Sequence, residues 1–119
     1  MSPSEHSILV VEDEHSLRAA AARQLRQTYS QVLEADSVAR ALALLQTERV
    51  DAILVDIHLQ DGSGFDIARQ FSAAVPRPRL IVLSGYGSSA DLTATDSAGF
   101  ERHLVKPIDL DQLRSALNR

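Results

Sequence analysis

Two acidic sites in this sequence follow apolar runs and could bind a metal ion together. Glu12 and Asp13 come directly after "ILVV", and Asp56 comes directly after "AILV". Carboxylates that face one another repel unless a cation lies between them. Mg²⁺ prefers carboxylate and carbonyl oxygens and keeps several of its waters, so a few protein groups can hold it. We therefore predict a Mg²⁺ site formed by Glu12, Asp13 and Asp56. Because the chain must turn back beyond Asp56, the backbone carbonyl of His58 is a further predicted ligand.

The same residues suggest phosphoryl chemistry. The Asp56 carboxylate could attack phosphorus as a nucleophile and form an aspartyl phosphate. Ser84 follows the apolar run "LIVL" and Lys106 follows "HLV", and a hydroxyl donor with a fixed cation suits an anionic phosphoryl group beside a metal. Structural alternatives remain open, since Asp13 could be the N-cap of a helix, "LSGYG" a simple turn and Lys-Pro a loop. The placement of all these groups after apolar runs favours a functional site.

Short apolar segments and helix-length segments alternate along the whole chain. The short segments are rich in β-branched residues and predict strands, over residues 7–11, 31–35, 52–55, 79–83 and 102–105. The clearest helix is predicted over residues 37–48, with apolar side chains repeating on one face and Asp36 or Ser37 as the cap. Further helices are predicted around residues 17–25, 67–71, 88–98 and 110–117.

This alternation predicts a doubly wound α/β domain, with a five-stranded parallel sheet covered by helices on both faces. In such sheets the ligand crevice lies beyond the carboxyl ends of the strands. The predicted strands end at the acids, at Ser84 and at Lys106, so these groups should meet at one edge of the sheet.

Length and composition narrow the class of protein further. A chain of 119 residues suits one domain, which we assign to residues 1–119 with a polar lead over 1–6 and a core over 7–118. The formal net charge of -4 argues against nucleic acid as a direct partner. The chain has no cysteine, no apolar run of the roughly 18 residues that a membrane span needs, and no secretory signal. We therefore predict a cytoplasmic protein with no membrane partner.

Four motifs together resemble the receiver domains of two-component response regulators. They are "ILVVEDE", "LVDIHLQDGSG", "IVLSGYG" and "HLVKP", and the resemblance covers essentially the whole chain. It implies a flavodoxin-like sheet with strand order 2-1-3-4-5. It also implies that a histidine kinase or a histidine phosphotransfer protein transfers a phosphoryl group from phosphohistidine to Asp56 in a Mg²⁺-dependent reaction. Ser84 then corresponds to the family's switch residue, and Lys106 to the lysine that pairs with the phosphate.

The sequence departs from the family pattern at two positions. His103 stands where the family has its switch aromatic residue, so its ring would either change exposure on activation or respond to pH. Gln60 stands where a proline is common. The resemblance further implies partner exchange through the fourth and fifth helices, with a homodimer as one option. "GFERHLVKPIDLDQL" resembles receivers of hybrid histidine kinases, so a stand-alone regulator and a piece of a larger chain both stay open, with the output expected elsewhere.

Three other functions compete with that of a signalling domain. Small Mg²⁺-dependent phosphatases or phosphotransferases of the haloacid-dehalogenase type carry a second acid two residues after the nucleophile, where this chain has His58. A phosphorylation-independent docking module would not need the complete set of Asp56, Ser84 and Lys106. A dinucleotide-binding domain is excluded because "EDEH" follows the first strand instead of a glycine-rich turn. We therefore predict a switch that does not turn over an external substrate.

Overall fold

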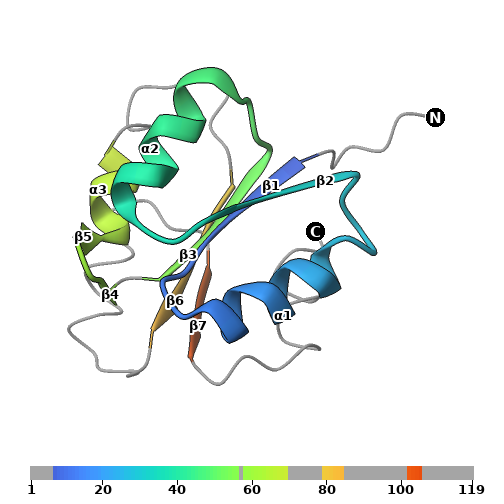
Figure 1. The fold of residues 1–119 in the computed structure, drawn as a ribbon, viewed down its shortest axis with the longest axis horizontal. Helices are drawn as coiled ribbons and strands as arrows, with labels where there is room; N and C mark the ends of the chain where they lie inside the picture. Colours follow the sequence, from blue (N-terminus) through green and yellow to red (C-terminus); the bar gives the residue numbers. More distant parts are fainter. Residues whose placement is uncertain (1–6, 57, 70–78, 85–101, 106–119) are drawn as a thin grey trace.

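The computed structural model contains a five-stranded parallel sheet with helices on both faces (Figure 1). It describes residues 7–56, 58–69, 79–84 and 102–105. The strands of the sheet are β1 (Ser7–Val11), β2 (Gln31–Ala35), β3 (Ala52–Asp56), β6 (Arg79–Ser84) and β7 (Arg102–Val105). Their order is β2-β1-β3-β6-β7, and all four neighbouring pairs are parallel. This is the predicted order 2-1-3-4-5 when the five strands are counted along the chain.

The predicted strand segments are confirmed, and two strands continue one residue beyond the apolar run. Asp56 is the last residue of β3 and pairs with Leu83 of β6. Ser84 is the last residue of β6 and pairs with Val105 of β7. In both strands backbone pairing therefore extends to the polar residue that follows the apolar run, which places Asp56 on a rigid element of the sheet.

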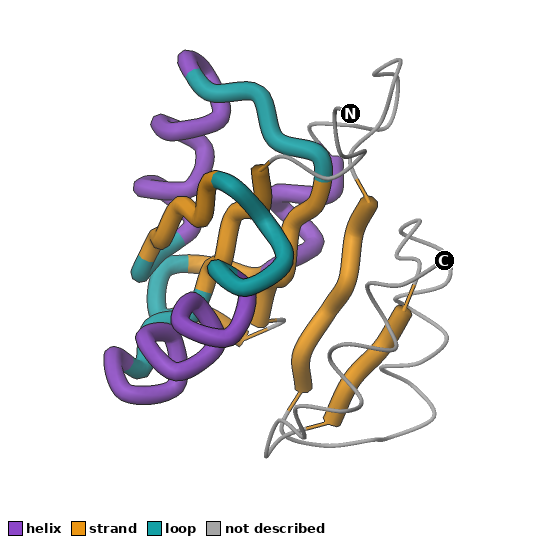
Figure 2. Tube along the Cα trace, turned by 90° about the vertical axis from the view of Figure 1, so that its right-hand side faces the viewer, coloured by secondary structure: helices purple, strands orange, loops and turns teal. Residues whose placement is uncertain are grey.

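Helices cover the two faces of the sheet with two separate cores (Figures 1 and 2). Because successive strand residues point to opposite faces, Ile8 and Val10 of β1 pack with Leu25, whereas Leu9 and Val11 pack on the other side. All five β1 residues are buried, as expected for a strand covered on both faces. The described helices are α1 (His15–Leu25), which covers the first face, and α2 (Val38–Thr47) and α3 (Gly64–Arg69), which cover the second.

The first residues of α1 and α2 show which of the predicted N-cap residues cap these helices. Ser37 is the N-cap of α2, and its side chain accepts a hydrogen bond from the Arg40 amide, which confirms one of the two predicted cap residues. The N-cap of α1 is Glu14, with no side-chain cap hydrogen bond, so the capping alternative for Asp13 is wrong. This frees the Asp13 carboxylate for the acidic cluster. Phe71 and the helices predicted over 88–98 and 110–117 lie outside the described residues.

A small antiparallel ribbon follows β3 and was not predicted. It consists of β4 (His58–Leu59) and β5 (Gly62–Ser63), with His58 paired to Ser63 and Leu59 to Gly62. Gln60 and Asp61 form the turn between the two strands. The ribbon leads directly into α3 and lies beside α2 and α3 in Figure 1. Within the part of the chain that the structure describes, no helix is long and apolar enough to cross a membrane.

Candidate metal centre

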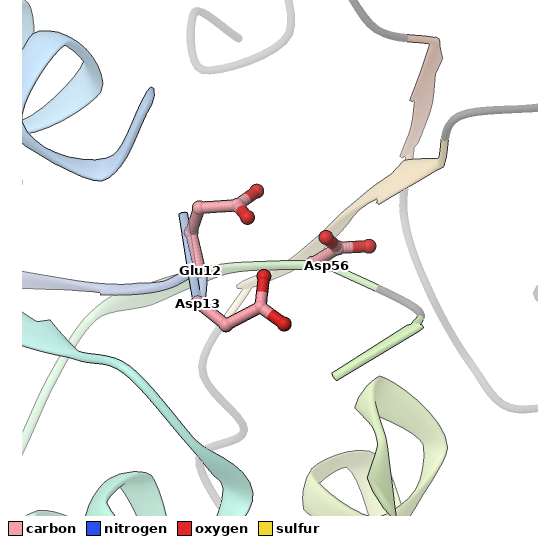
Figure 3. Close-up of side chains that lie close together, drawn as sticks. All are labelled: Glu12, Asp13 and Asp56. Carbon is pink, nitrogen blue, oxygen red and sulfur yellow. The ribbon is translucent and has the colours of Figure 1, made fainter. Parts of the chain in front are cut away.

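Three carboxylates converge at the carboxyl edge of the sheet. Val11 of β1 pairs with Val55 of β3, so Glu12, directly after β1, lies beside Asp56, the last residue of β3. Each of Glu12, Asp13 and Asp56 offers a carboxylate oxygen, and these atoms all lie within 4.8 Å of one another (Figure 3). The structure thus brings together the three acids that the sequence predicted as metal ligands.

Burial makes this cluster different from an ordinary group of surface acids. The exposed fraction is 1% for Glu12 and 4% for Asp56, whereas Asp13 is half-buried. Removing carboxylates from water and placing them close together is unfavourable unless a positive charge compensates them. The three ligand atoms are all hard oxygens, which is the donor set that Mg²⁺ prefers. The residues present therefore fit a Mg²⁺ ion.

Hydrogen bonds from three directions hold Glu12 in place. Its backbone amide donates to the Ala35 carbonyl of β2 at 3.0 Å, which continues the pairing of the sheet past the end of β1. Its side-chain Oε2 accepts from the Glu14 amide at 3.0 Å. Its backbone carbonyl accepts from Arg18 Nη1 at 2.9 Å. The first predicted ligand is therefore fixed through both its backbone and its side chain.

Arg18 of α1 contacts the acidic cluster through the Glu12 carbonyl. The sequence did not predict this role. The Arg18 Nε lies 3.3 Å from Glu34 Oε1 of β2, and its side chain is 14% exposed. Its Nη2 also lies 3.0 Å from His15 Nδ1. A cation in the first turn of a helix opposes the helix dipole, and this unfavourable position was the available signal that Arg18 has another role. Arg18 joins α1, the end of β1 and β2 beside the acidic cluster.

The register also relates the other predicted site residues to Asp56. Leu83 pairs with Asp56, and the next residue of β6, Ser84, pairs with Val105 at the end of β7. The backbone of Ser84 is therefore one residue beyond the neighbour of Asp56. Lys106 and the side chains of Ser84 and His103 lie outside the described residues, so the roles predicted for them stay predictions. His58 is described in its backbone as part of β4, and its carbonyl stays a predicted ligand.

Fold and site together define a doubly wound domain with an acidic, oxygen-donor centre at the carboxyl edge of its sheet. Residues 8–118 match the family model described as the response regulator receiver domain. The chain belongs to this family of signalling domains, as its motifs suggested.

Curated relatives are regulatory proteins that are longer than this chain. The photosynthetic apparatus regulatory protein RegA of Rhodobacter capsulatus is 29% identical over 114 residues, which are 96% of this chain and 62% of that protein. The acid tolerance regulatory protein ActR of Rhizobium meliloti is 32% identical over 95% of this chain and 58% of its own length. The chain therefore spans less than two thirds of these relatives.

Solved structures agree with the fold. A CheY-like response regulator receiver domain protein from Methanospirillum hungatei has a TM-score of 0.84 at 25% identity, covering 94% of this chain and 90% of that one. A response regulator from Burkholderia pseudomallei, described with a phosphorylated aspartic acid, a calcium ion and citrate, has a TM-score of 0.85 at 30% identity, covering 96% and 67%. The second protein holds a divalent cation and a phosphorylated aspartate in the same type of fold.

Proposed function

We propose that Asp56 is the phosphoacceptor of a receiver domain and takes its phosphoryl group from phosphohistidine on a histidine kinase or a histidine phosphotransfer protein. The observation that carries the proposal is the buried Asp56 carboxylate at the end of β3, within 4.8 Å of the Glu12 and Asp13 carboxylate oxygens. A nucleophile on a paired strand is held rigidly, which favours a defined direction of attack. The phosphorylated aspartate of the Burkholderia pseudomallei regulator supports this choice of residue type.

Glu12, Asp13 and Asp56 would hold Mg²⁺ together with the His58 carbonyl, and the ion when bound supplies positive charge for the carboxylates and for the phosphoryl oxygens. One Asp56 oxygen attacks phosphorus and forms an O–P bond. The N–P bond of the phosphohistidine breaks, and its electron pair returns to the imidazole nitrogen. The burial of Asp56 keeps bulk water away from most of its surface, which favours transfer to the carboxylate over transfer to water.

We assign the response to the transfer to Ser84, Lys106 and His103. The Lys106 ammonium would pair with the phosphoryl group, and the Ser84 hydroxyl would donate to one of its oxygens. These contacts exist only after phosphorylation, so they favour the active one of two conformations, with His103 on the neighbouring strand as the second switch position. The result of the reaction is thus a shifted conformational equilibrium of the domain. The phosphoryl group stays on the domain, as expected of a self-phosphorylating signalling domain.

The partners of this domain follow from the same proposal. We place the domain in the cytoplasm. We assign its exchange of partners, with a homodimer as one option, to the fourth and fifth helices predicted over residues 88–98 and 110–117. Two of its relatives are named as regulatory proteins, which supports an output in the regulation of another process. We further propose that residues 1–119 form one receiver unit.

The test is the intact mass of the protein after incubation with Mg²⁺ and a small phosphoryl donor such as phosphoramidate. We expect one phosphoryl adduct in the wild type, and none in Asp56→Asn or in the presence of a chelator. Asp36→Asn is the matched control, because Asp36 is an exposed acid that also follows a strand at this edge of the sheet. An adduct that persists in Asp56→Asn contradicts the proposal. Steady turnover of a simple phosphate ester would instead favour the phosphatase, and partner binding without any adduct the docking module.

A further inference from the structure

The first turn of α2 receives part of its cap from the loop that follows β3. The Val38 amide donates to Asp61 Oδ1 at 2.9 Å, and the Ala39 amide donates to Asp61 Oδ2 at 3.0 Å. The Arg40 amide donates to Ser37 Oγ at 3.1 Å. The first amides of a helix have no partner within the helix, so Asp61 satisfies two of them and Ser37 a third. Ser37 and Asp61, which are far apart in the sequence, therefore cap the same helix end.

The charge of Asp61 matches this position. The hydrogen bonds from the Val38 and Ala39 amides hold the pKa of the Asp61 carboxyl below its ordinary value, so the group is ionised at neutral pH. Helix α2 has no acidic residue in its own first turn. The negative charge that stabilises the positive end of a helix is thus supplied from the β4–β5 ribbon.

Close packing joins the ribbon to α2 at the same place. A Cβ atom built on Gly62 would lie 3.2 Å from Val38 Cγ2, so the Gly62 backbone sits directly against the first residue of the helix. Leu59 of β4 is buried in the core that also contains Val38 and Ile67. The ribbon is therefore seated on α2 by hydrogen bonds, by a close backbone approach and by a buried side chain.

We infer that Asp61 is a positioning residue for the metal centre: it ties the β4–β5 ribbon to the start of α2 and thereby fixes the backbone of His58. The inference rests on the proposed function, in which the His58 carbonyl is a Mg²⁺ ligand. A ribbon with only two residue pairs has little stability of its own. Without the link the His58 carbonyl would sample more positions, and ordering it on metal binding would cost affinity. Residues that orient metal ligands have this kind of effect.

Two variants separate positioning from simple stabilisation of α2. Asp61→Ala removes the link between ribbon and helix. Ser37→Ala is the matched control, because it removes a cap hydrogen bond from the same helix end and leaves the link intact. Asp61→Asn keeps one carbonyl oxygen as an acceptor and should restore part of the effect. The Mg²⁺ affinity is measured from the NMR shifts of the Glu12 and Asp13 amides during a Mg²⁺ titration.

We expect Asp61→Ala to weaken Mg²⁺ binding about fivefold, and Ser37→Ala to change it less than about twofold. An intermediate value for Asp61→Asn supports the inference further. Unchanged affinity in Asp61→Ala, or equal weakening in both alanine variants, overturns it, since the metal centre would then respond only to the stability of the helix.

Amide hydrogen exchange in the metal-free protein separates this inference from the proposed function. Faster exchange of the Leu59 and Gly62 amides in Asp61→Ala, but not in Ser37→Ala, supports the link between ribbon and helix. Equal exchange in the wild type and Asp61→Ala refutes the link. If the wild type binds no Mg²⁺ at the acidic cluster, the proposed metal centre is refuted. The positioning role of Asp61 is then refuted as well, even if hydrogen exchange supports the link between ribbon and helix.

Discussion

Arg18 offers a quantitative test of how the metal centre is held. Arg18→Met keeps the apolar stem of the side chain but removes the hydrogen bond to the Glu12 carbonyl and the ion pair with Glu34. It also removes the contact with His15, which is exposed and contributes little. The hydrogen bond from a charged donor at this largely buried site contributes about 1.5 kcal/mol. The ion pair, with side chains 14% and 32% exposed, contributes about 0.5 kcal/mol. Removing a cation from the first turn of α1 regains about 0.3 kcal/mol, so the free energy of unfolding should fall by about 1.7 kcal/mol.

Urea unfolding at pH 7 without Mg²⁺ measures this loss. With an m-value of about 1.5 kcal/mol/M, the midpoint of Arg18→Met should fall by about 1.1 M urea. Arg26→Met is the matched control, because Arg26 pairs with the same Glu34 from a side chain that is 55% exposed, and its midpoint should fall by no more than about 0.3 M. Equal shifts in the two variants would refute the reasoning, because the bond to the Glu12 carbonyl would then contribute nothing.

Three further predictions concern the charges at this edge of the sheet. Asp56→Asn should raise the stability of the metal-free protein by about 1 kcal/mol, because it relieves repulsion within the acidic cluster; a loss of stability in urea unfolding would contradict this. Mg²⁺ at about 100 times its Kd should stabilise the wild type by about 2.7 kcal/mol, and Asp13→Asn should abolish most of this gain in the same assay; an equal gain in both proteins would exclude Asp13 as a ligand. The Asp61 pKa is lower in the folded protein than the ordinary 3.8, so its contribution to stability is complete above that value and is lost as the pH falls through the lowered pKa. Urea midpoints of the wild type should therefore approach those of Asp61→Asn at acid pH, and a constant difference between pH 7 and pH 3 would contradict the shift.

The inner strands β1 and β3 could be predicted from the sequence because they are buried on both faces. An inner strand of this kind is a nearly continuous apolar run, as in β3, where all five residues are buried. The apolar pattern predicted the ends of β3 and β6 to within one residue. Both strands are one residue longer than predicted because Asp56 pairs with Leu83 and Ser84 pairs with Val105. Such pairing depends on the neighbouring strand and leaves no trace in the local pattern.

The acidic cluster could be predicted for a related reason. Once the strands are known to be parallel, the residues after β1 and β3 must meet at one edge, and Glu12, Asp13 and Asp56 do. The capping alternative for Asp13 failed because the first helix begins two residues later, at His15. Local sequence alone could not separate a cap from a ligand at this position.

The supporting contacts could not be predicted because they join residues that are distant in the sequence. Asp61 bonds to a helix start 23 positions earlier, and Arg18 bonds to Glu34, 16 positions later. Neither contact follows a helical or strand repeat. The first depends on how the β4–β5 ribbon folds back onto α2, and the second on the packing of α1 beside β2.

The most direct test of the central claim is to locate the phosphoryl group on the chain. The protein is treated with Mg²⁺ and phosphoramidate and then with borohydride, which reduces an aspartyl phosphate to homoserine, and its peptides are sequenced by mass spectrometry. We predict homoserine at position 56 and aspartate at position 13. Homoserine at another aspartate, or a phosphoryl group found on a histidine such as His58, would contradict this prediction.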